Sequence, residues 1–420
     1  MTRGALLKLR GVVSNRADWR VGSALGVLFT SLVTGCAAPL RQEAAGPTPD
    51  PPPARADSAS HPAADRQAGA PGGEALPWWD HPAAFSHRRR ITVSTANDAI
   101  GRRYTVSIPL DHAGLVREGE SLPGGDDLRI ARWSGGVWVE LHRLVGGSGW
   151  NHEQTEIWFA LQEPLAPFST ASNYFVYYGS REVLTAPEDP SQIYYYYSNF
   201  SSPEAFARDW TIYSVNQEPI EYAIVGGALY KGDQNSTQVE RKPFINDKVV
   251  LTGTGEKARG LYVRYRYRPS PSRPELDDDL FGVGLCSADA EPAGFYAGIT
   301  GRDDWYDGSE VTPAPPAESK AAAGYWRGAE RDYSTDFSNR LQLDLRSGHT
   351  VVAVWTVSSL ALWLDGSFIS AWPAGPLEDG YFCFASQGMP DLFIDELMLR
   401  RLVDSEPVTE LGPEERREDS

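Results

Sequence analysis

From Trp78 onward the sequence is a succession of short runs of β-branched and aromatic residues, separated by glycine, proline, asparagine and aspartate. Runs such as YTVSI (104–108) and VWVEL (137–141) alternate along their length. Alternation indicates a half-buried antiparallel strand, because successive side chains of a strand point to opposite faces of its sheet. Helix signals are scarce, so we predict an all-β protein.

The runs fall into two groups along the chain. Six runs over residues 78–188 suit one small β-sandwich, since such a domain needs about 100 residues. The runs over residues 189–405 suit one large sandwich rather than two small folds. Within them, Asp365-Gly366 separates two alternating runs, which is a strong hairpin signal. The acidic stretch 406–420 is predicted to be a disordered tail.

Four blocks of the first group resemble a known module: WWDHPAAFSHRRRITVST (78–95), GGDDLRIAR (124–132), TEIWFALQEPLAPFS (155–169) and NYFVYYGS (173–180). Blocks of this kind occur in the same order in the domain-of-unknown-function family 2341. Ser180 stands where that family usually has Asn. The family occurs in bacterial surface and exported proteins and has no settled activity. The resemblance therefore implies a fold and a setting, but no catalytic residues.

The second group resembles the concanavalin-like and laminin-G-like jelly rolls. It opens on Asp209-Trp210 and continues with the early strand Gly227-Ala228-Leu229. The hairpin at Leu364-Asp365-Gly366 comes late, and the last strand, Ile394 to Arg401, ends on basic residues. The resemblance spans about residues 198–405 and implies a fold more than a function. We therefore predict two consecutive β-sandwiches, the second a concanavalin-like jelly roll, after a signal peptide and a disordered linker.

The first 35 residues have the layout of an export signal. A basic start precedes an uncharged, mostly apolar run from Val21 to Gly35, which is shorter than the ~20 residues needed to span a bilayer. Val33-Thr34-Gly35-Cys36 resembles the lipobox of bacterial lipoproteins. The resemblance implies that Cys36 carries lipid and becomes the first residue of the mature chain. Ala37, in place of Asp, favours the outer membrane among Gram-negative relatives.

Residues 36–77 are predicted to form a disordered tether behind the lipidated cysteine, because they are rich in Ala, Pro and Gly and poor in core-forming side chains. These features predict a lipid-anchored protein of the bacterial cell envelope, at the outer membrane or the cell surface. The membrane is thus an expected partner, reached through the lipid on Cys36.

The charge of the chain excludes one class of partner. The sequence has 39 basic and 56 acidic residues, and removal of residues 1–35 leaves 34 and 55, a net charge of −21. Nucleic-acid binding needs clustered Lys and Arg, so we expect no nucleic acid. The same balance argues against electrostatic docking on anionic lipid.

Cys286 and Cys383 are the remaining cysteines. An even pair in an exported chain could form a disulfide. The alternative is two buried free thiols in neighbouring strands, because both contexts, GVGLCSA and GYFCFAS, are also typical of a plain core.

No intact catalytic motif is found. Glu275-Leu276-Asp277 begins like the strand of laminarinase-type hydrolases, whose Glu-x-Asp-x-x-Glu points three carboxylates into a cleft. The position of the last Glu is Leu280, so a solvated acidic turn is the better interpretation. No nucleophilic triad and no zinc-ligand spacing is visible, and we expect a protein that is not an enzyme.

An acidic loop could bind calcium through hard oxygen ligands, although its spacing does not follow the EF-hand pattern. Its candidate ligands are Asp303, Asp304, Asp307 and Glu310. No other cofactor is expected.

Aromatic residues in Gly-rich, polar stretches are candidates for stacking on sugar rings. They are Trp305, Tyr306, Tyr325 and Trp326. The alternative is that these rings hold long loops against the sandwich. The leading hypothesis is therefore a non-catalytic module that binds an extracellular glycan. A glycoside hydrolase, or an adhesive protein that binds surface proteins, is the alternative.

Overall fold

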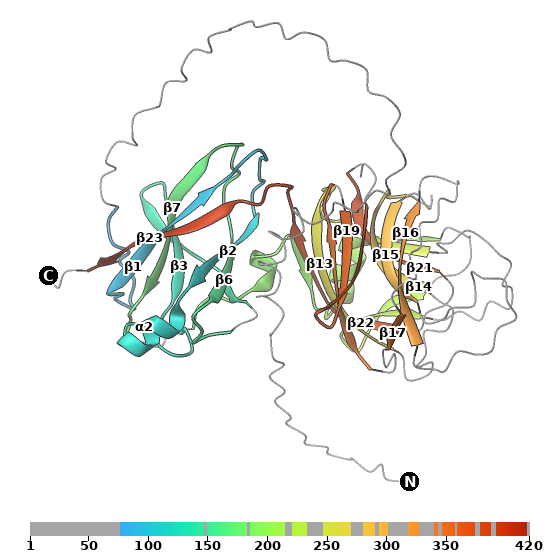
Figure 1. The fold of residues 1–420 in the computed structure, drawn as a ribbon, viewed down its shortest axis with the longest axis horizontal. Helices are drawn as coiled ribbons and strands as arrows, with labels where there is room; N and C mark the ends of the chain where they lie inside the picture. Colours follow the sequence, from blue (N-terminus) through green and yellow to red (C-terminus); the bar gives the residue numbers. More distant parts are fainter. Residues whose placement is uncertain are drawn as a thin grey trace, which may run out of the picture.

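The structure, a computed structural model, describes residues 76–146, 149–182, 185–214, 221–232, 247–269, 280–289, 294–300, 318–326, 340–342, 347–357, 359–373, 379–387 and 392–417. Within these residues the chain consists of strands, two short helices and one 3₁₀ turn: α2 (His112–Glu118), α3 (Pro203–Asp209) and η1 (Pro190–Gln192). The predicted all-β class is confirmed. None of the helices in this part of the chain has the length and apolar character needed to cross a membrane. Figure 1 shows two lobes of strands.

The first lobe is a small sandwich of two antiparallel sheets. The five-stranded sheet has the order β23-β1-β7-β3-β4, and the three-stranded sheet has the order β2-β6-β5. The larger sheet consists of β23 (Val408–Arg416), β1 (His87–Ser94), β7 (Thr170–Tyr178), β3 (Arg129–Ser134) and β4 (Val137–Leu141). The smaller sheet consists of β2 (Thr105–Leu110), β6 (Thr155–Ala160) and β5 (Leu144–Val145).

Alternating apolar residues of both sheets fill the space between them, as the sequence pattern predicts. Ile91, Ile108, Ile130, Phe159 and Val176 are fully buried there. The opposite face of the larger sheet is covered as well, by the segment that precedes β1. This coverage explains why the strand TASNYFVYY ends in five consecutive buried residues.

The arginine-rich start of β1 is partly a core feature. Arg88 is 2% exposed and lies over the ring of Trp78 at 4.6 Å. Its guanidinium donates to the carbonyl oxygens of Leu76 (2.9 Å) and Pro77 (3.0 Å) and pairs with Glu415 at 2.6 Å. A buried cation needs such partners, so the Trp and Arg residues of the first block work as one structural unit.

The GGDDLR turn is a second such unit. The carboxylate of Asp127, 1% exposed, accepts from the backbone N–H groups of Leu122 and Gly179, each at 2.9 Å. Gly125 has φ +67°, and a Cβ there would lie 2.5 Å from the ring of Trp150. This position therefore requires glycine.

The second lobe is a larger sandwich. One sheet has the order β10-β11-β22-β13-β18-β19-β20, with β8 also paired to β22, and the other, the seven-stranded sheet, has the order β17-β16-β15-β14-β21-β12-β9. The first of these consists of β10 (Glu221–Val225), β11 (Ala228–Gly232), β22 (Leu392–Arg401), β13 (Leu261–Pro269), β18 (His349–Trp355), β19 (Ser359–Leu364), β20 (Ser367–Pro373) and β8 (Tyr196–Ser198). The seven-stranded sheet consists of β17 (Arg340–Gln342), β16 (Glu318–Trp326), β15 (Gly294–Thr300), β14 (Leu280–Cys286), β21 (Tyr381–Gln387), β12 (Asp247–Leu251) and β9 (Trp210–Ser214).

The main core of the second lobe lies between these two sheets and includes Trp210, Tyr265, Trp355 and Phe384. The predicted hairpin is confirmed: Asp365 and Gly366 connect β19 to β20 with φ values of 47° and 80°. Two positive φ values in succession are the geometry that matches the twist of the flanking strands.

The prediction of a disordered tail over 406–420 is wrong. Val408–Arg416 forms β23, an antiparallel partner of β1 that runs back across the first lobe (Figure 1). The acidic residues of this segment lie opposite the basic residues of β1 in the register Arg88↔Glu415 and Arg89↔Glu414. Charge pairing across two strands stabilises the segment. The first lobe is therefore built from residues that precede the second lobe in the sequence and from the strand that follows it.

The segment between β22 and β23 connects the two lobes. Glu406 accepts a hydrogen bond from the hydroxyl of Tyr104 (2.7 Å) in the first lobe and pairs with Arg400 (2.9 Å) of β22. Nearby, the hydroxyl of Thr105 donates to the carbonyl oxygen of Ile193 at 2.7 Å. The lobes are thus joined by direct polar contacts as well as by the chain.

Candidate functional site

The seven-stranded sheet of the second lobe carries apolar side chains on both faces. Phe281, Val283 and Leu285 of β14 point into the main core, as do Phe382 and Phe384 of β21. The alternate residues form a separate group on the opposite face, which we call the outer-face cluster: Val250, Cys286, Tyr296, Cys383 and Ala385, with Tyr213, Ala288 and Tyr381 partly buried against it. The face of a sandwich sheet that points away from the core is usually polar, so this cluster marks the face as unusual.

The register of the strands brings the cluster together. Gly284 of β14 lies between Tyr296 on β15 and Cys383 on β21, and Cys383 lies opposite Val250 on β12. Glycine leaves the centre of this row without a side chain. One row further along, Gly282 faces Gly298, and a Cβ on Gly282 would lie 2.2 Å from the carbonyl oxygen of Ala297. This close approach requires glycine.

Polar groups border the cluster on one side. The hydroxyl of Tyr213 donates to the carbonyl oxygen of Ala288 at 2.9 Å. The buried Lys248 donates through Nζ to the carbonyl oxygen of Ser287 at 2.9 Å and lies 3.6 Å from the carboxylate of Asp289. Its ammonium lies 5.8 Å from the centre of the Tyr213 ring. A partly exposed ring beside a cation is thus held in place by several contacts.

The titratable groups in the centre of the cluster are held neutral. Burial raises the pKa of Tyr296 well above its ordinary value, and Cys383, Cys286 and Asp289 raise it further. Burial likewise raises the pKa of the Cys383 thiol, and the hydrogen bond that this thiol donates to Cys286 raises it further. Nucleophilic sulfur chemistry needs the thiolate, so this centre is an apolar floor rather than a reactive site.

A carboxylate acts on the rings of the outer-face cluster. After burial, Asp289 is the charge that most raises the pKa of Tyr213, and it also acts on Tyr296. Glycoside hydrolysis uses a pair of carboxyl groups about 5–10 Å apart. In the described residues around this cluster, Asp289 is the carboxylate that acts on the rings, and it is paired with Lys248.

The predicted aromatic residues are placed only in part. Trp305 and Tyr306 lie outside the described residues. Tyr325 and Trp326 are the last two residues of β16, in a regular strand rather than in an irregular stretch. The backbone register places Trp326 opposite Gly294, which in turn lies opposite Cys286. The strand position of Trp326 is therefore in the same row as one cysteine of the outer-face cluster.

Other predicted residues lie outside the described part of the chain. They are the calcium candidates Asp303, Asp304, Asp307 and Glu310, the lipidation site Cys36, and the acidic turn Glu275-Leu276-Asp277. Cys286 and Cys383 are described, and both are buried free thiols on neighbouring strands. Of the two alternatives for this pair, the structure has the free thiols.

Sequence reasoning missed Tyr213, Tyr381 and Lys248. A usable signal was present, because YFCFA (381–385) is apolar at every position and LFGVGLC (280–286) is interrupted only by glycine. A strand without alternation is covered on both faces. The pattern therefore predicts a cluster behind the sheet, although it does not name the residues at its border.

The structure also brings together three polar residues at the Asp365 hairpin. Nδ1 of His349 lies 2.6 Å from Oδ2 of Asp365, and Nε2 lies 3.2 Å from Oγ of Ser347. The order of partners is that of a nucleophile–base–acid chain. Oδ1 of Asp365 also accepts from the backbone N–H of Thr350 at 2.8 Å. We interpret the group as a brace that holds the β19–β20 turn against β18.

Comparisons with known proteins give distant likenesses only. No protein-family model matches the chain. Aconitate hydratase A from Bacillus subtilis (strain 168) is 24% identical over 181 residues, which cover 43% of this chain and 16% of that protein. The chain therefore spans about a sixth of the length of this curated relative.

Among solved structures, a laminarinase from Flavobacterium sp. UMI-01 has a TM-score of 0.33 and 11% identity, covering 50% of this chain and 100% of that one. An endo-β-1,3-glucanase from Pyrococcus furiosus has the same TM-score and identity, with coverage of 52% and 95%. A lichenase from a mouse hindgut metagenome also has a TM-score of 0.33 and 11% identity, with coverage of 49% and 99%. At this distance the likenesses assign no activity.

Proposed function

We propose that the protein is a lipid-anchored protein of the bacterial envelope whose second lobe, a concanavalin-like jelly roll, binds an extracellular glycan without cleaving it. The observation that carries this proposal is the outer-face cluster, where the partly exposed rings of Tyr213 and Tyr381 border a buried apolar row that contains glycine. Flat aromatic surfaces suit the apolar faces of sugar rings, and ligand sites combine such surfaces with a few polar groups. Asp289, whose side chain is 52% exposed, supplies such a group, and the buried Lys248 pairs with it from below.

Binding is favoured over hydrolysis by the same geometry. Asp289 is the carboxylate next to the rings, and its charge is offset by Lys248 at 3.6 Å. A general acid with a raised pKa and a second free carboxylate are both needed for glycoside cleavage. An adhesive role, in which the cluster contacts a surface protein, is the competing outcome.

Glycan binding can be tested on the secreted form of the chain, with Cys36 replaced by serine so that it stays in solution. We expect binding to one class of glycan on an array and about tenfold weaker binding for Tyr381→Ala, because losing one stacked ring costs roughly 1.4 kcal/mol. Phe168→Ala, which removes a ring 78% exposed on the first lobe, is the matched control and should bind normally.

The result of the array separates the three functions. Binding to no glycan would refute the proposal, and capture of a surface protein by the same face would replace it with adhesion. Release of reducing sugar from a bound β-glucan would show a hydrolase instead. The array is also run with and without calcium. Glycan binding that requires calcium would support the acidic stretch at 303–310 as a metal site.

The anchor is supported by the sequence before the folded part. The described chain begins at Leu76, 40 residues after Cys36. If residues 37–75 form the flexible tether that their composition predicts, it spans roughly 35 Å on average, enough to hold the first lobe clear of a lipid surface. The proposed location is the outer membrane or the cell surface.

Replacing Cys36 with serine is expected to move the protein from the membrane fraction to the soluble fraction of the exporting cells. Without a sulfur to alkylate, no acyl chains are attached, and membrane affinity from acyl chains is lost. Mass spectrometry of the wild-type protein should show a lipid-modified cysteine at the mature amino terminus. An unmodified residue there, or a different mature start, would contradict the proposed anchor.

A further inference from the structure

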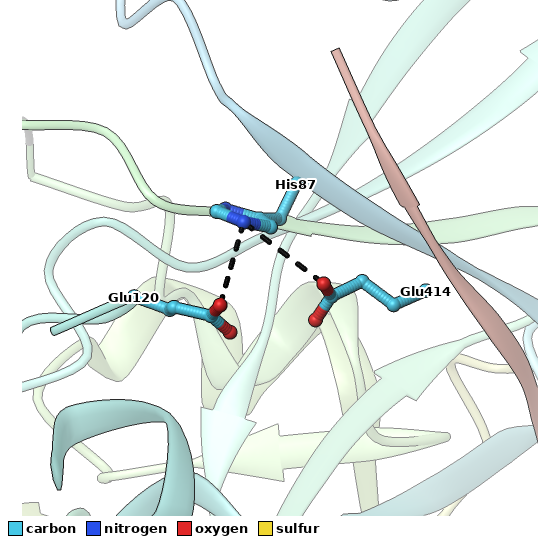
Figure 2. A group of neighbouring side chains, drawn as sticks. All are labelled: His87, Glu120 and Glu414. Carbon is cyan, nitrogen blue, oxygen red and sulfur yellow. Dashed lines mark ion pairs between the residues drawn. The ribbon is translucent and has the colours of Figure 1, made fainter. Parts of the chain in front are cut away.

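Three potential metal ligands from distant parts of the sequence meet at one edge of the first lobe (Figure 2). His87 is the first residue of β1, Glu120 follows α2, and Glu414 belongs to β23. Nε2 of His87 lies 3.7 Å from Oε1 of Glu120 and 4.0 Å from Oε1 of Glu414. The three side chains are 13%, 13% and 27% exposed. The group is therefore mostly enclosed by protein, with one open side.

Hydrogen bonds fix the orientation and the tautomer of the histidine. The hydroxyl of Ser86 donates its single proton to the carbonyl oxygen of Gly179 at 2.9 Å. Its contact with Nδ1 of His87, at 2.8 Å, must then have the ring N–H as the donor. The ring also stacks on Tyr178, with centroids 5.4 Å apart and planes 7° apart. In the neutral ring, Nε2 therefore directs its lone pair at the two carboxylates.

Two carboxylate oxygens beside Nε2 make this a favourable place for a positive charge, which either a proton on Nε2 or a cation bound by the three groups supplies. The distances of 3.7 and 4.0 Å are too long for hydrogen bonds. Oε2 of Glu120 is buried and has no hydrogen-bond partner among the described residues. The site thus offers more negative charge at its centre than its own hydrogen bonds satisfy.

Arg416 supplies part of the missing charge from the open side. Its guanidinium lies 2.7 Å from Oε1 of Glu120 and 2.8 Å from Oε1 of Glu414. The side chain of Arg416 is 67% exposed, so it can swing into solvent. The inner side is more rigid, because Oε2 of Glu414 accepts a hydrogen bond from the hydroxyl of Tyr178 at 2.8 Å.

We propose that His87, Glu120 and Glu414 form a divalent-cation site in which the ion replaces Arg416 and fastens the C-terminal strand to the rest of the first lobe. One imidazole and two carboxylates suit zinc and similar transition metals, with water on the open side. Two ligands at ~2.1 Å from a tetrahedral ion lie about 3.4 Å apart. The distances from His87 to the two carboxylates are 3.7 and 4.0 Å, and all three ligand atoms lie within 4.8 Å of one another, so the side chains need to move inward to close on the ion. Ser86 and Tyr178 would hold the ligands from behind, as outer partners of metal sites usually do.

Zinc is the probe for a direct test on the secreted chain. Calorimetry should show one equivalent of Zn²⁺ bound, and the melting temperature of the first lobe should rise by about 10 °C when free zinc is at 100 times Kd. His87→Gln and Glu120→Gln should each weaken binding at least tenfold. Arg416→Gln should retain or strengthen binding, because it removes the competing cation. A purely structural role for the cluster would not produce this opposite response.

The controls separate this site from other effects. His152→Gln removes an exposed histidine elsewhere on the first lobe and should leave zinc binding unchanged. The melting temperature of each variant without metal shows whether it folds, and the Arg416 variant keeps all three ligands. No zinc, manganese or cobalt binding by the wild-type chain, or equal binding by His87→Gln, would overturn the proposal.

Discussion

Deleting residues 407–420 is expected to unfold the first lobe and to leave the second lobe folded. The deletion removes β23, the antiparallel partner of β1 along its whole length. Arg88, 2% exposed, would lose its ion pair with Glu415, and the buried hydroxyl of Tyr178 would lose its acceptor, Glu414. Loss of a hydrogen bond to a charged partner costs about 1.5–3 kcal/mol, and together with the lost strand pairing this is a large share of the stability of a small domain.

Thermal unfolding followed by circular dichroism, together with limited proteolysis, would measure this effect. The wild-type chain should show the transitions of both lobes, and the truncated chain should keep only that of the second. Deletion of residues 418–420, which lie beyond β23, is the matched control and should change nothing. Glu415→Gln is a finer variant that keeps the strand and should lower the stability of the first lobe by a smaller amount. A truncated chain with both transitions intact would refute the expectation.

Asp247→Asn is expected to destabilise the second lobe by about 3–5 kcal/mol, since it leaves a buried lysine without its counter-charge. Asp247 and Lys231 are each 5% exposed and lie 3.1 Å apart. The carboxylate also accepts hydrogen bonds of 2.7 Å from the hydroxyls of Tyr222 and Ser386. The pair therefore connects strands of both sheets at one end of the sandwich.

The double variant Lys231→Met, Asp247→Asn should recover most of the loss, because it removes the unpaired cation and keeps an oxygen that can accept from Tyr222. Urea unfolding of each variant gives the free energies. Asp379→Asn is the control: Asp379 pairs with Arg259 at 3.2 Å, but the two side chains are 55% and 61% exposed. An exposed pair contributes at most ~1 kcal/mol. Equal losses at both positions would contradict the importance of burial.

Local patterns predicted the class and the hairpin, because each is determined by neighbouring residues. The alternation in YTVSI predicts a strand, and Asp365-Gly366 predicts a turn, from the local residues alone. The strand VTELGPEER was missed, since its glycine, proline and acids are typical of a solvated tail. Its partner β1 lies more than three hundred residues earlier in the chain, so the residues of the segment itself do not predict the pairing.

The candidate sites were beyond local prediction for the same reason. His87 was one of several scattered histidines, and only the pairing of β1 with β23 brings Glu414 beside it. Arg88 belongs to a run of three arginines, which is typical of a solvent-exposed strand face. The residues before β1 nevertheless enclose the side chain of Arg88. On the outer face of the second lobe, Tyr213 and Tyr381 come from strands separated by most of that lobe.

The return of the chain to the first lobe has a mechanical consequence. The second lobe is inserted between β7 and β23, so two covalent connections join it to the first: the stretch from Gly179 to Tyr195 and the stretch from Leu402 to Pro407. A pull on a ligand held by the second lobe would divide between these two connections, instead of straining a single linker. The polar contacts of Glu406 lie at the second connection and would share that load. The two connections would therefore suit the proposed function, in which the second lobe binds a ligand while the chain is anchored before the first lobe.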